Sequence, residues 1–283
     1  MTEKGGACEE EAEAAHAALS GVPLRSVSYG GGQDSTALLV LAAQRRIDYS
    51  LFLFANTGDD SEHPDTLRYL REVATPYAAK HGIELVELHR VRRDGTPETL
   101  RQRLDAGRMA IPVRREKDGP PMSRSCTADF KVRVVGKELK RRGATAATPA
   151  TVAIGITVDE IERAKPGIDP RAPYQNRTYP LLDLGLHRRD CVSIISGAGL
   201  PIPPKSSCWF CPHHSIEAWR RLKRQTPELF AGACELESSM SAATKDGRPV
   251  FLTRAGRPLV DVIDDQEQLP GLGDDCDSGW CFT

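Results

Sequence analysis

The feature that most constrains the fold is a run of three glycines between a predicted strand and a predicted helix. Residues 25–29 predict a short buried strand, and residues 30–33 predict a tight glycine turn. Residues 34–46 follow with the spacing of an amphipathic helix. A strand, a glycine turn and a helix in direct succession are typical of the first unit of an α/β sheet.

The alternation continues along the chain. Strands are predicted at 49–55, 83–88 and 151–156, and a helix at 64–81 that stops at Gly82. Strands that alternate with helices favour parallel pairing, with the connecting helices packed on the sheet. We therefore expect an α/β fold with a parallel twisted sheet and helices on both faces.

The remaining elements are predicted with less regular spacing. The segment 90–143 is expected to be mostly helical with a break at 118–121, followed by a fifth strand at 178–182 and helices at 187–198 and 215–225. A late hairpin is expected at 251–262. The predicted organisation is a flexible acidic leader (1–22), an α/β domain (23–200), a helical and hairpin appendage with the cysteine motif (201–262) and an acidic cysteine-containing tail (263–283).

The composition restricts where in the cell the protein is expected. The chain of 283 residues is 40% hydrophobic and 27% charged, and no apolar run approaches the roughly 20 residues of a membrane span. The first 18 residues lack the basic start and apolar stretch of a signal peptide. We expect a cytoplasmic protein with no membrane partner, in which eight cysteines serve as metal, cluster or redox-active thiols and not as disulfides.

Charge is distributed unevenly. Between Arg90 and Arg142 there are 16 Lys and Arg residues against 7 Asp and Glu residues, whereas residues 258–283 hold 7 acidic and no basic residues. A basic segment suits a polyanion such as a nucleic acid. A solvated face rich in arginine is the alternative interpretation.

The glycine turn has the chemistry of a phosphate site. Glycines let backbone N–H groups approach phosphate oxygens, and the following helix points its partial positive end at the same place. Because a carboxylate beside phosphates is repulsive alone, Asp34 implies a bridging magnesium ion. The candidate phosphate-binding residues here are Ser28, Gly30, Gly31, Gly32, Gln33, Asp34, Ser35 and Thr36.

This loop lacks the lysine of G-x-x-x-x-G-K-[ST] and differs from G-x-G-x-x-G. It resembles the S-G-G-x-D-S loop of the PP-loop ATP pyrophosphatases, which grips the pyrophosphate released from ATP. Gly30 stands where that motif has its first serine, which removes one hydroxyl contact. A glycine turn without a ligand is the alternative.

Two further segments follow predicted strands. Residues 54–58 (Phe-Ala-Asn-Thr-Gly) with Pro64-Asp65-Thr66 resemble the phosphoadenosine-phosphosulfate reductase branch, in which this segment lies beside the nucleotide. The resemblance assigns Asn56, Thr57 and Gly58 to ATP binding; a structural turn is the alternative. Gly155 ends the fourth strand at the same edge and is expected to face the active site, with Arg163 nearby as a counter-charge or a loop salt bridge.

The cysteines supply the second motif, residues 208–214 (Cys-Trp-Phe-Cys-Pro-His-His). A C-x-x-C pair shares one metal or cluster but needs further ligands, and Cys126 is the best third candidate. Three cysteines around a [4Fe–4S] cluster leave one iron open, an arrangement that resembles the cluster-dependent tRNA thiolases. Zinc on Cys126, Cys208, Cys211 and His213 or His214, or a persulfide without metal, remain open because spacing does not choose the metal.

The remaining cysteines give weaker functional predictions. Cys276 and Cys281 lie in the acidic tail, which lacks the Glu-Cys-Gly-Leu-His signature of sulfonucleotide reductases; a passive tail and a sulfur relay both stay open. Cys8 and Cys234 receive no role, and Cys191 is predicted to be core.

The resemblance implies an ATP pyrophosphatase that activates a substrate for sulfur incorporation, with Asp34, Ser35 and Cys126 as catalytic residues. A substrate oxygen attacks the α-phosphorus, pyrophosphate leaves, and sulfur then displaces AMP. The same branch contains the ATP-pyrophosphatase component of DNA phosphorothioation systems, which is preferred over tRNA thiolation, and a separate cysteine desulfurase is the expected sulfur donor. The rivals are a thioredoxin-dependent sulfonucleotide reductase and a non-catalytic zinc-bearing nucleic-acid binder.

Overall fold

The computed structural model describes residues 23–108, 110–165 and 167–267 and divides them into two compact units. The first unit comprises the chain up to Ala55, Asp65–Leu88 and Val132–Ser206. The second comprises Asn56–Pro64, His89–Lys131 and the chain from Ser207 onward. The predicted leader and most of the predicted tail, with Cys8, Cys276 and Cys281, lie outside the described residues.

The first unit contains a six-stranded sheet in the order β3-β2-β1-β4-β6-β5. Strand β1 pairs in parallel with β2 and β4, β4 pairs in parallel with β6, and only β5 is recorded as antiparallel to its neighbour β6. The strands are β1 Arg25–Ser28, β2 Leu51–Asn56, β3 Glu84–His89, β4 Ala150–Ile154, β5 Gly167–Ile168 and β6 Gln175–Thr178. The predicted α/β class with a mostly parallel sheet is confirmed.

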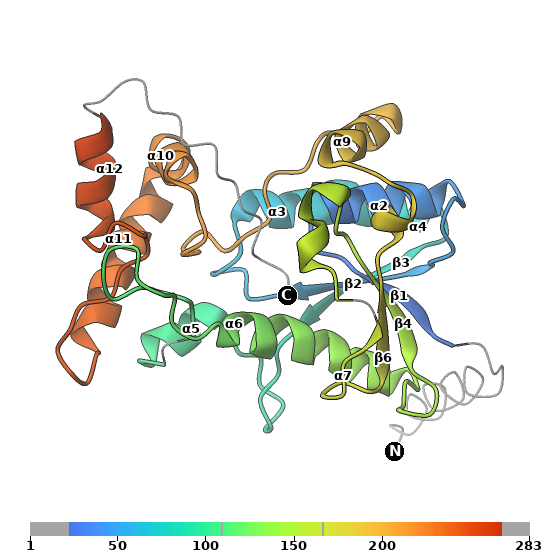
Figure 1. Cartoon of the computed structure of the whole chain (residues 1–283), viewed down its shortest axis with the longest axis horizontal. Helices are drawn as coiled ribbons and strands as arrows, with labels where there is room; N and C mark the ends of the chain where they lie inside the picture. Colours follow the sequence, from blue (N-terminus) through green and yellow to red (C-terminus); the bar gives the residue numbers. More distant parts are fainter. Residues whose placement is uncertain (1–22, 109, 166, 268–283) are drawn as a thin grey trace, which may run out of the picture. The chain divides into compact units, whose positions relative to one another are not determined.

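Helices cover both faces of this sheet, as the sequence predicted. In β2, Phe52 and Phe54 pack into a core with residues of α2 (Gln33–Ala43) and α9 (Arg188–Gly197). The intervening Leu53 packs instead with α7 (Arg133–Arg141). Because side chains alternate across a strand, these two cores lie on opposite faces, and Figure 1 shows α2 and α9 on one side of the strands and α7 on the other.

The predicted helix at 64–81 is present, with one irregular turn. It runs as α3 (Pro64–Tyr69), a π-helical turn (Leu70–Ala74) and α4 (Thr75–Lys80). Pro76 lacks an N–H and crowds the preceding turn, and the wider π turn just before it accommodates the proline. The helix ends before Gly82, whose φ is +69°.

Two predictions in the middle of the chain are wrong. The fifth strand, predicted at 178–182, ends at Thr178, because Pro180 begins the short helix α8 (Pro180–Asp183). The segment 90–143 is not mostly helical, since residues 106–108 and 110–124 lie outside any helix. Its helices are α5 (Leu100–Asp105), α6 (Ser125–Thr127), a π-helical turn (Ala128–Val132) and α7.

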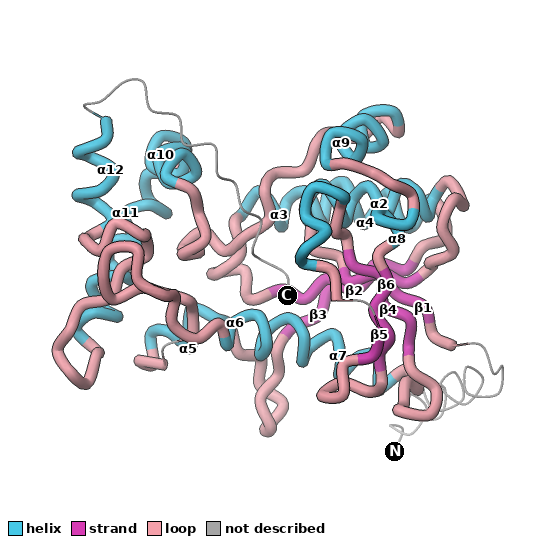
Figure 2. Tube along the Cα trace, viewed as in Figure 1, coloured by secondary structure: helices cyan, strands magenta, loops and turns pink. Residues whose placement is uncertain are grey.

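The second unit is built from helices and loops around its own core (Figure 2). Helix α10 (Ile216–Gln225), α11 (Pro227–Ala242) and α12 (Leu259–Glu267) pack on one another, with Trp219 fully buried among them. The predicted hairpin at 251–262 is wrong. Phe251 forms only an isolated bridge with Arg114, and the chain turns helical at Leu259.

Across the described part of the chain, every helix is too short or too polar to cross a membrane.

Candidate active site

The glycine turn of the first unit is tightly packed. Gly31 has φ +76°, and a Cβ there would lie 3.0 Å from Thr66 Cγ2 and 3.3 Å from Phe54 Cε2. The hydroxyl of Ser206 donates a hydrogen bond to the carbonyl of Gly30. A side chain at position 31 would be both strained and crowded, so the turn requires glycine there.

Helix α2 begins directly after this turn without a side-chain cap. Gly32 is the N-cap residue and offers no side chain to the first N–H groups. Ser35 Oγ donates back to Gly32 O at 3.1 Å, and Ser35 is only 7% exposed. The uncapped first turn leaves backbone donors and the helix dipole available to an anion, which is the property expected of a phosphate site.

The hydroxyl of Thr36 faces the other way. It lies 3.0 Å from the hydroxyl of Tyr29, and both residues are buried. Thr36 therefore holds the turn from the core side, whereas Ser28 and Gln33 are half-buried.

Asp34 occupies the first turn of α2. Its Oδ1 is buried and accepts no hydrogen bond from any described residue. Burial raises the pKa of Asp34, and the nearby charge of Glu160 adds to that rise, while Arg188 and Arg163 oppose it. A buried carboxylate oxygen without a donor fits a hard cation such as Mg²⁺, for which phosphate oxygens supply further ligands.

Gly155 brings the end of β4 to the same place. A Cβ at Gly155 would lie 3.0 Å from Ser35 N and 3.2 Å from Asp34 Cβ. The strand end therefore abuts the first turn of α2, and the structure brings Gly155 together with Asp34 and Ser35 as predicted.

The second unit contains the predicted Asn56–Gly58 segment. Asn56 Oδ1 accepts from Gly58 N at 2.7 Å, and Asn56 Nδ2 donates to Asp59 Oδ1 at 2.8 Å. Gly58 has φ +127°, and a Cβ there would lie 2.5 Å from Thr99 Cβ. These contacts build a local turn of the kind named as the alternative, and they place Asn56 and Gly58 within that turn.

Thr57 connects this turn to the cysteine motif. Its hydroxyl donates to Glu62 Oε1 at 3.0 Å and lies 3.3 Å from Cys208 Sγ. Glu62 is 1% exposed, and Lys131 Nζ lies 3.9 Å from its Oε1. Sequence reasoning missed Glu62 because no motif spacing marks it; its only signal is a carboxylate in the same short turn as Thr57.

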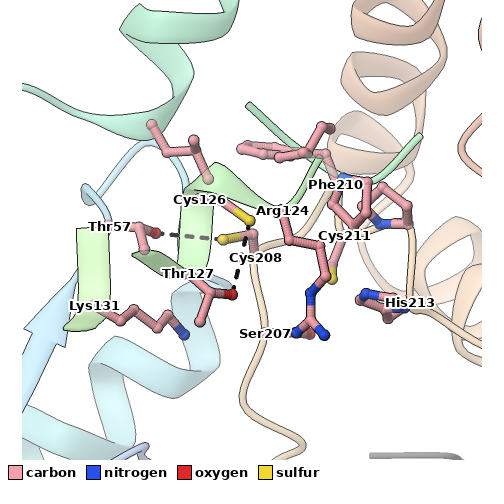
Figure 3. Close-up of a pocket in the computed structure, with 14 residues that line it drawn as sticks. Thr57, Arg124, Cys126, Thr127, Lys131, Ser207, Cys208, Phe210, Cys211 and His213 are labelled. Carbon is pink, nitrogen blue, oxygen red and sulfur yellow. Dashed lines mark hydrogen bonds between the residues drawn. The ribbon is translucent and has the colours of Figure 1, made fainter. Parts of the chain in front are cut away.

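Three cysteines line one pocket of this unit. Cys126, Cys208 and Cys211 all line this pocket. Figure 3 shows the sulfurs of Cys126 and Cys208 close to each other, with the sulfur of Cys211 turned toward His213. The prediction that Cys126 joins the C-x-x-C pair thus matches the placement of the three thiols in one pocket; Arg124, Thr127 and Lys131 also line it.

Burial favours the protonated forms of the Cys126 and Cys208 thiols. Burial raises the pKa of Cys208 well above its ordinary value, and Glu62 adds to the rise. Burial also raises the pKa of Cys126, against the opposing effects of Thr127 and Lys131. Within the described ranges, no three His, Cys, Asp or Glu side chains are arranged to hold one metal ion, so the pocket has the donor types for a cluster or zinc without their convergence.

The two candidate histidines are placed differently. His213 lines the pocket. His214 Nε2 lies 2.9 Å from Ser207 Oγ and 3.0 Å from the carbonyl of Cys208, and its ring contacts that of Trp219. Of the two, His213 is the one that faces the cysteines, while His214 supports the loop.

The predicted site residues thus fall into two groups. The first unit holds Ser28, Gly30, Gly31, Gly32, Gln33, Asp34, Ser35, Thr36 and Gly155. The second holds Asn56, Thr57, Gly58, Cys126, Cys208 and Cys211. Of the cysteines without a predicted role, Cys191 is fully buried in the core of the first unit, as predicted.

Comparisons with known proteins identify no family. No family model matches the chain, and no curated protein matches it. Among solved structures, the fold is similar to the U34-tRNA thiolase NcsA from Methanococcus maripaludis, solved with its [4Fe–4S] cluster, at a TM-score of 0.42. That alignment has 14% sequence identity and covers 84% of this chain and 78% of the thiolase.

Proposed function

We propose that this chain is an ATP pyrophosphatase of the PP-loop type that activates a nucleic acid for sulfur incorporation. The observation that carries the proposal is the uncapped first turn of α2 behind the glycine turn, with Asp34 Oδ1 buried and accepting no hydrogen bond from the described residues. Backbone donors and a carboxylate in one turn suit a phosphate and its counter-ion together.

In this proposal the backbone N–H groups of Gly31–Ser35 bind the phosphates that leave as pyrophosphate. Asp34 would hold Mg²⁺, which neutralises phosphate charge when bound. A substrate oxygen forms a bond to the α-phosphorus, and the bond from that phosphorus to the bridging oxygen breaks. Positioning and charge neutralisation carry such a reaction without a strong base.

The thiol pocket is the proposed source of sulfur. Because the three thiols do not converge on one point, no step is assigned to a cluster or to zinc, although Cys126, Cys208 and Cys211 are the residues that would hold either. The facing thiols of Cys126 and Cys208 favour a persulfide route. The outer sulfur of a persulfide on Cys126 displaces AMP, and Cys208 then cleaves the mixed disulfide, which leaves a Cys126–Cys208 disulfide for an external dithiol to reduce.

The proposed substrate is nucleic acid, with DNA phosphorothioation ahead of tRNA thiolation, and a cysteine desulfurase supplies the persulfide sulfur. Much of the basic segment is engaged in ion pairs, such as Arg103 with Asp129 and Arg115 with Asp246. Arg93, Lys117 and Lys137 make no ion pair among the described residues and stay available for a polyanion.

The test is pyrophosphate release from ATP by anaerobically purified protein, without nucleic acid, with duplex DNA and with tRNA. Asp34→Asn should lower the rate by about a hundredfold or more because it removes the carboxylate that would hold Mg²⁺ at the phosphates. Asp48→Asn is the matched control, since that side chain is 92% exposed. Nucleic-acid binding that is indifferent to Asp34, without any pyrophosphate, would favour the binding module instead.

Metal content and visible absorption of the same preparation separate the sulfur carriers. Iron with broad absorption at about 400 nm assigns a cluster. Zinc assigns a structural site, and a mass increase of one sulfur on Cys126 or Cys208 without metal assigns the persulfide.

A further inference from the structure

A buried carboxylate in the first unit holds two arginines. Glu160, in the 3-10 helix Val158–Arg163, is 8% exposed and accepts hydrogen bonds from Arg163 Nη1 and, at 2.8 Å, from Arg188 Nη2. Arg163 comes from the same short helix, and Arg188 is the first residue of α9. One buried carboxylate thus anchors both guanidinium groups.

Asp159 fixes the start of helix α9, where Arg188 lies. Asp159 Oδ2 accepts from the backbone N–H of Arg188 at 2.7 Å, and Asp159 Oδ1 lies 2.9 Å from His187 Nδ1. The start of α9 is therefore held by its backbone, and Glu160 then sets the direction of the Arg188 side chain. Such a guanidinium is ordered before any ligand arrives.

These arginines act at Asp34. The end of β4 abuts the first turn of α2 through Gly155, and Val158–Arg163 follows three residues later. Helix α9 packs on α2, and its Cys191 and Ile195 share a core with Leu38. Consistent with this convergence, Arg188 and Arg163 both act to lower the pKa of Asp34.

The side chains of the two arginines differ in their exposure to solvent. The side chain of Arg163 is 10% exposed, whereas that of Arg188 is 41% exposed while still bonded to Glu160. Arg188 thus keeps donors open to a ligand beside Asp34. A guanidinium has five N–H donors in a fork that matches phosphate oxygens, and one bond to Glu160 leaves several of them for a phosphate.

We propose that Arg188 binds the phosphate that stays with adenosine when pyrophosphate leaves, and that Glu160 is the positioning residue for its guanidinium. This inference rests on the proposed function, because it assumes an adenine nucleotide at the turn 30–35. In the proposed function, the backbone of that turn binds the leaving phosphates, and a cation that Asp34 would hold neutralises their charge. The α-phosphate is the remaining anionic group, and Arg188 is the accessible cation next to it.

The test is direct binding of AMP and of adenosine, measured by calorimetry on the full chain. Arg188→Met should weaken AMP binding about tenfold to a hundredfold, because a charged hydrogen bond is lost, and leave adenosine binding unchanged. Arg188→Lys should recover part of the AMP affinity. Arg189→Met is the matched control, since Arg189 is next to Arg188 in the chain, its side chain is 84% exposed, and its one recorded ion pair is with Asp190.

Glu160→Gln should weaken AMP binding in the same direction by a smaller factor, again with adenosine unchanged. If Arg188→Met weakens the binding of AMP and adenosine equally, or weakens neither, the inference about Arg188 is overturned. The proposed function still stands in that case if the wild-type chain releases pyrophosphate from ATP. A wild-type chain that binds AMP no better than adenosine and releases no pyrophosphate would overturn both.

Discussion

At the scale of single residues, the candidate phosphate site depends on two glycines that are needed for different reasons. Gly31 has a left-handed backbone and a crowded Cβ position, so a substitution there combines backbone strain with a clash. Gly155 has no such backbone restriction, and only space is limiting, because its Cβ would meet the first turn of α2. A substitution at Gly155 therefore tests only the packing of β4 against that turn, without added backbone strain.

Gly155→Ala should displace the first turn of α2 and impair pyrophosphate release by about tenfold, because the N–H donors proposed to bind phosphate move with it. Overpacking at such a contact costs about 1–3 kcal/mol of unfolding free energy. Gly197→Ala in α9 is the control, since nothing lies within 4 Å of a Cβ there. Thermal melting and activity check both variants; unchanged activity in Gly155→Ala would show that this contact does not position the turn.

At the scale of elements, one buried carboxylate connects three parts of the second unit. Glu237 in α11 accepts from Leu252 N and from Leu259 N, each at 2.7 Å. The second of these is the first N–H of α12, which has no partner within its own helix. The side chain of Glu237 therefore joins α11, the loop after it and the start of α12.

Glu237→Gln should lower the free energy of unfolding by about 1–3 kcal/mol, because the amide turns an N–H₂ toward one of the two backbone donors. Glu235→Gln on the exposed side of the same helix is the control. Denaturant unfolding checks the difference, and equal stability of the two variants would contradict the role given to Glu237.

The same carboxylate predicts a pH dependence. Burial raises the pKa of Glu237 from 4.5 in spite of the two backbone hydrogen bonds. A raised native pKa favours the protonated native form, so this contribution to stability is complete below about pH 4.5 and is lost as pH rises through the raised pKa. The stability of wild type relative to Glu237→Gln should therefore fall as pH rises through that window, and a constant difference would contradict the raised pKa.

Elements with strong local patterns could be predicted from the sequence, and those whose pattern was ambiguous could not. Strand β2 and helix α2 carry continuous apolar runs beside a glycine turn, and both are present. The hairpin at 251–262 was wrong because apolar residues there fit a strand. The buried Leu259, Val262 and Ile263 have instead the i, i+3, i+4 spacing of a helix that Pro258 introduces.

The candidate site residues likewise divide into those that the sequence could predict and those that it could not. The glycine turn and the C-x-x-C pair are contiguous motifs, so the sequence could predict them. The contacts of Thr57 with Glu62 and Cys208, and of Glu160 with Arg188, join residues whose chain separation carries no periodic signal. Such partners are set by tertiary packing, which one sequence does not display.

At the scale of the whole molecule, the phosphate turn and the thiol pocket belong to different compact units, each with its own buried core. The chain passes between the units several times, at residues such as Ala55–Asn56 and Ser206–Ser207. The proposed function needs both units, one to activate and one to donate sulfur. Neither unit is a continuous segment, so a single cut in the chain cannot release either unit intact.

The charge distribution predicts how binding to nucleic acid responds to salt. Arg93 and Lys117 are exposed and make no ion pair among the described residues, so each should release about one counterion from a polyanion. The double variant Arg93→Gln with Lys117→Gln should flatten the slope of log K against log salt by about 2. Lys80→Gln with Arg189→Gln removes the same charge from exposed positions outside the basic segment. Fluorescence anisotropy with duplex DNA and tRNA from about 50 to 200 mM salt measures both slopes. Equal flattening in both variants would assign binding to net charge alone, whereas flattening confined to the first would place the polyanion on the basic segment.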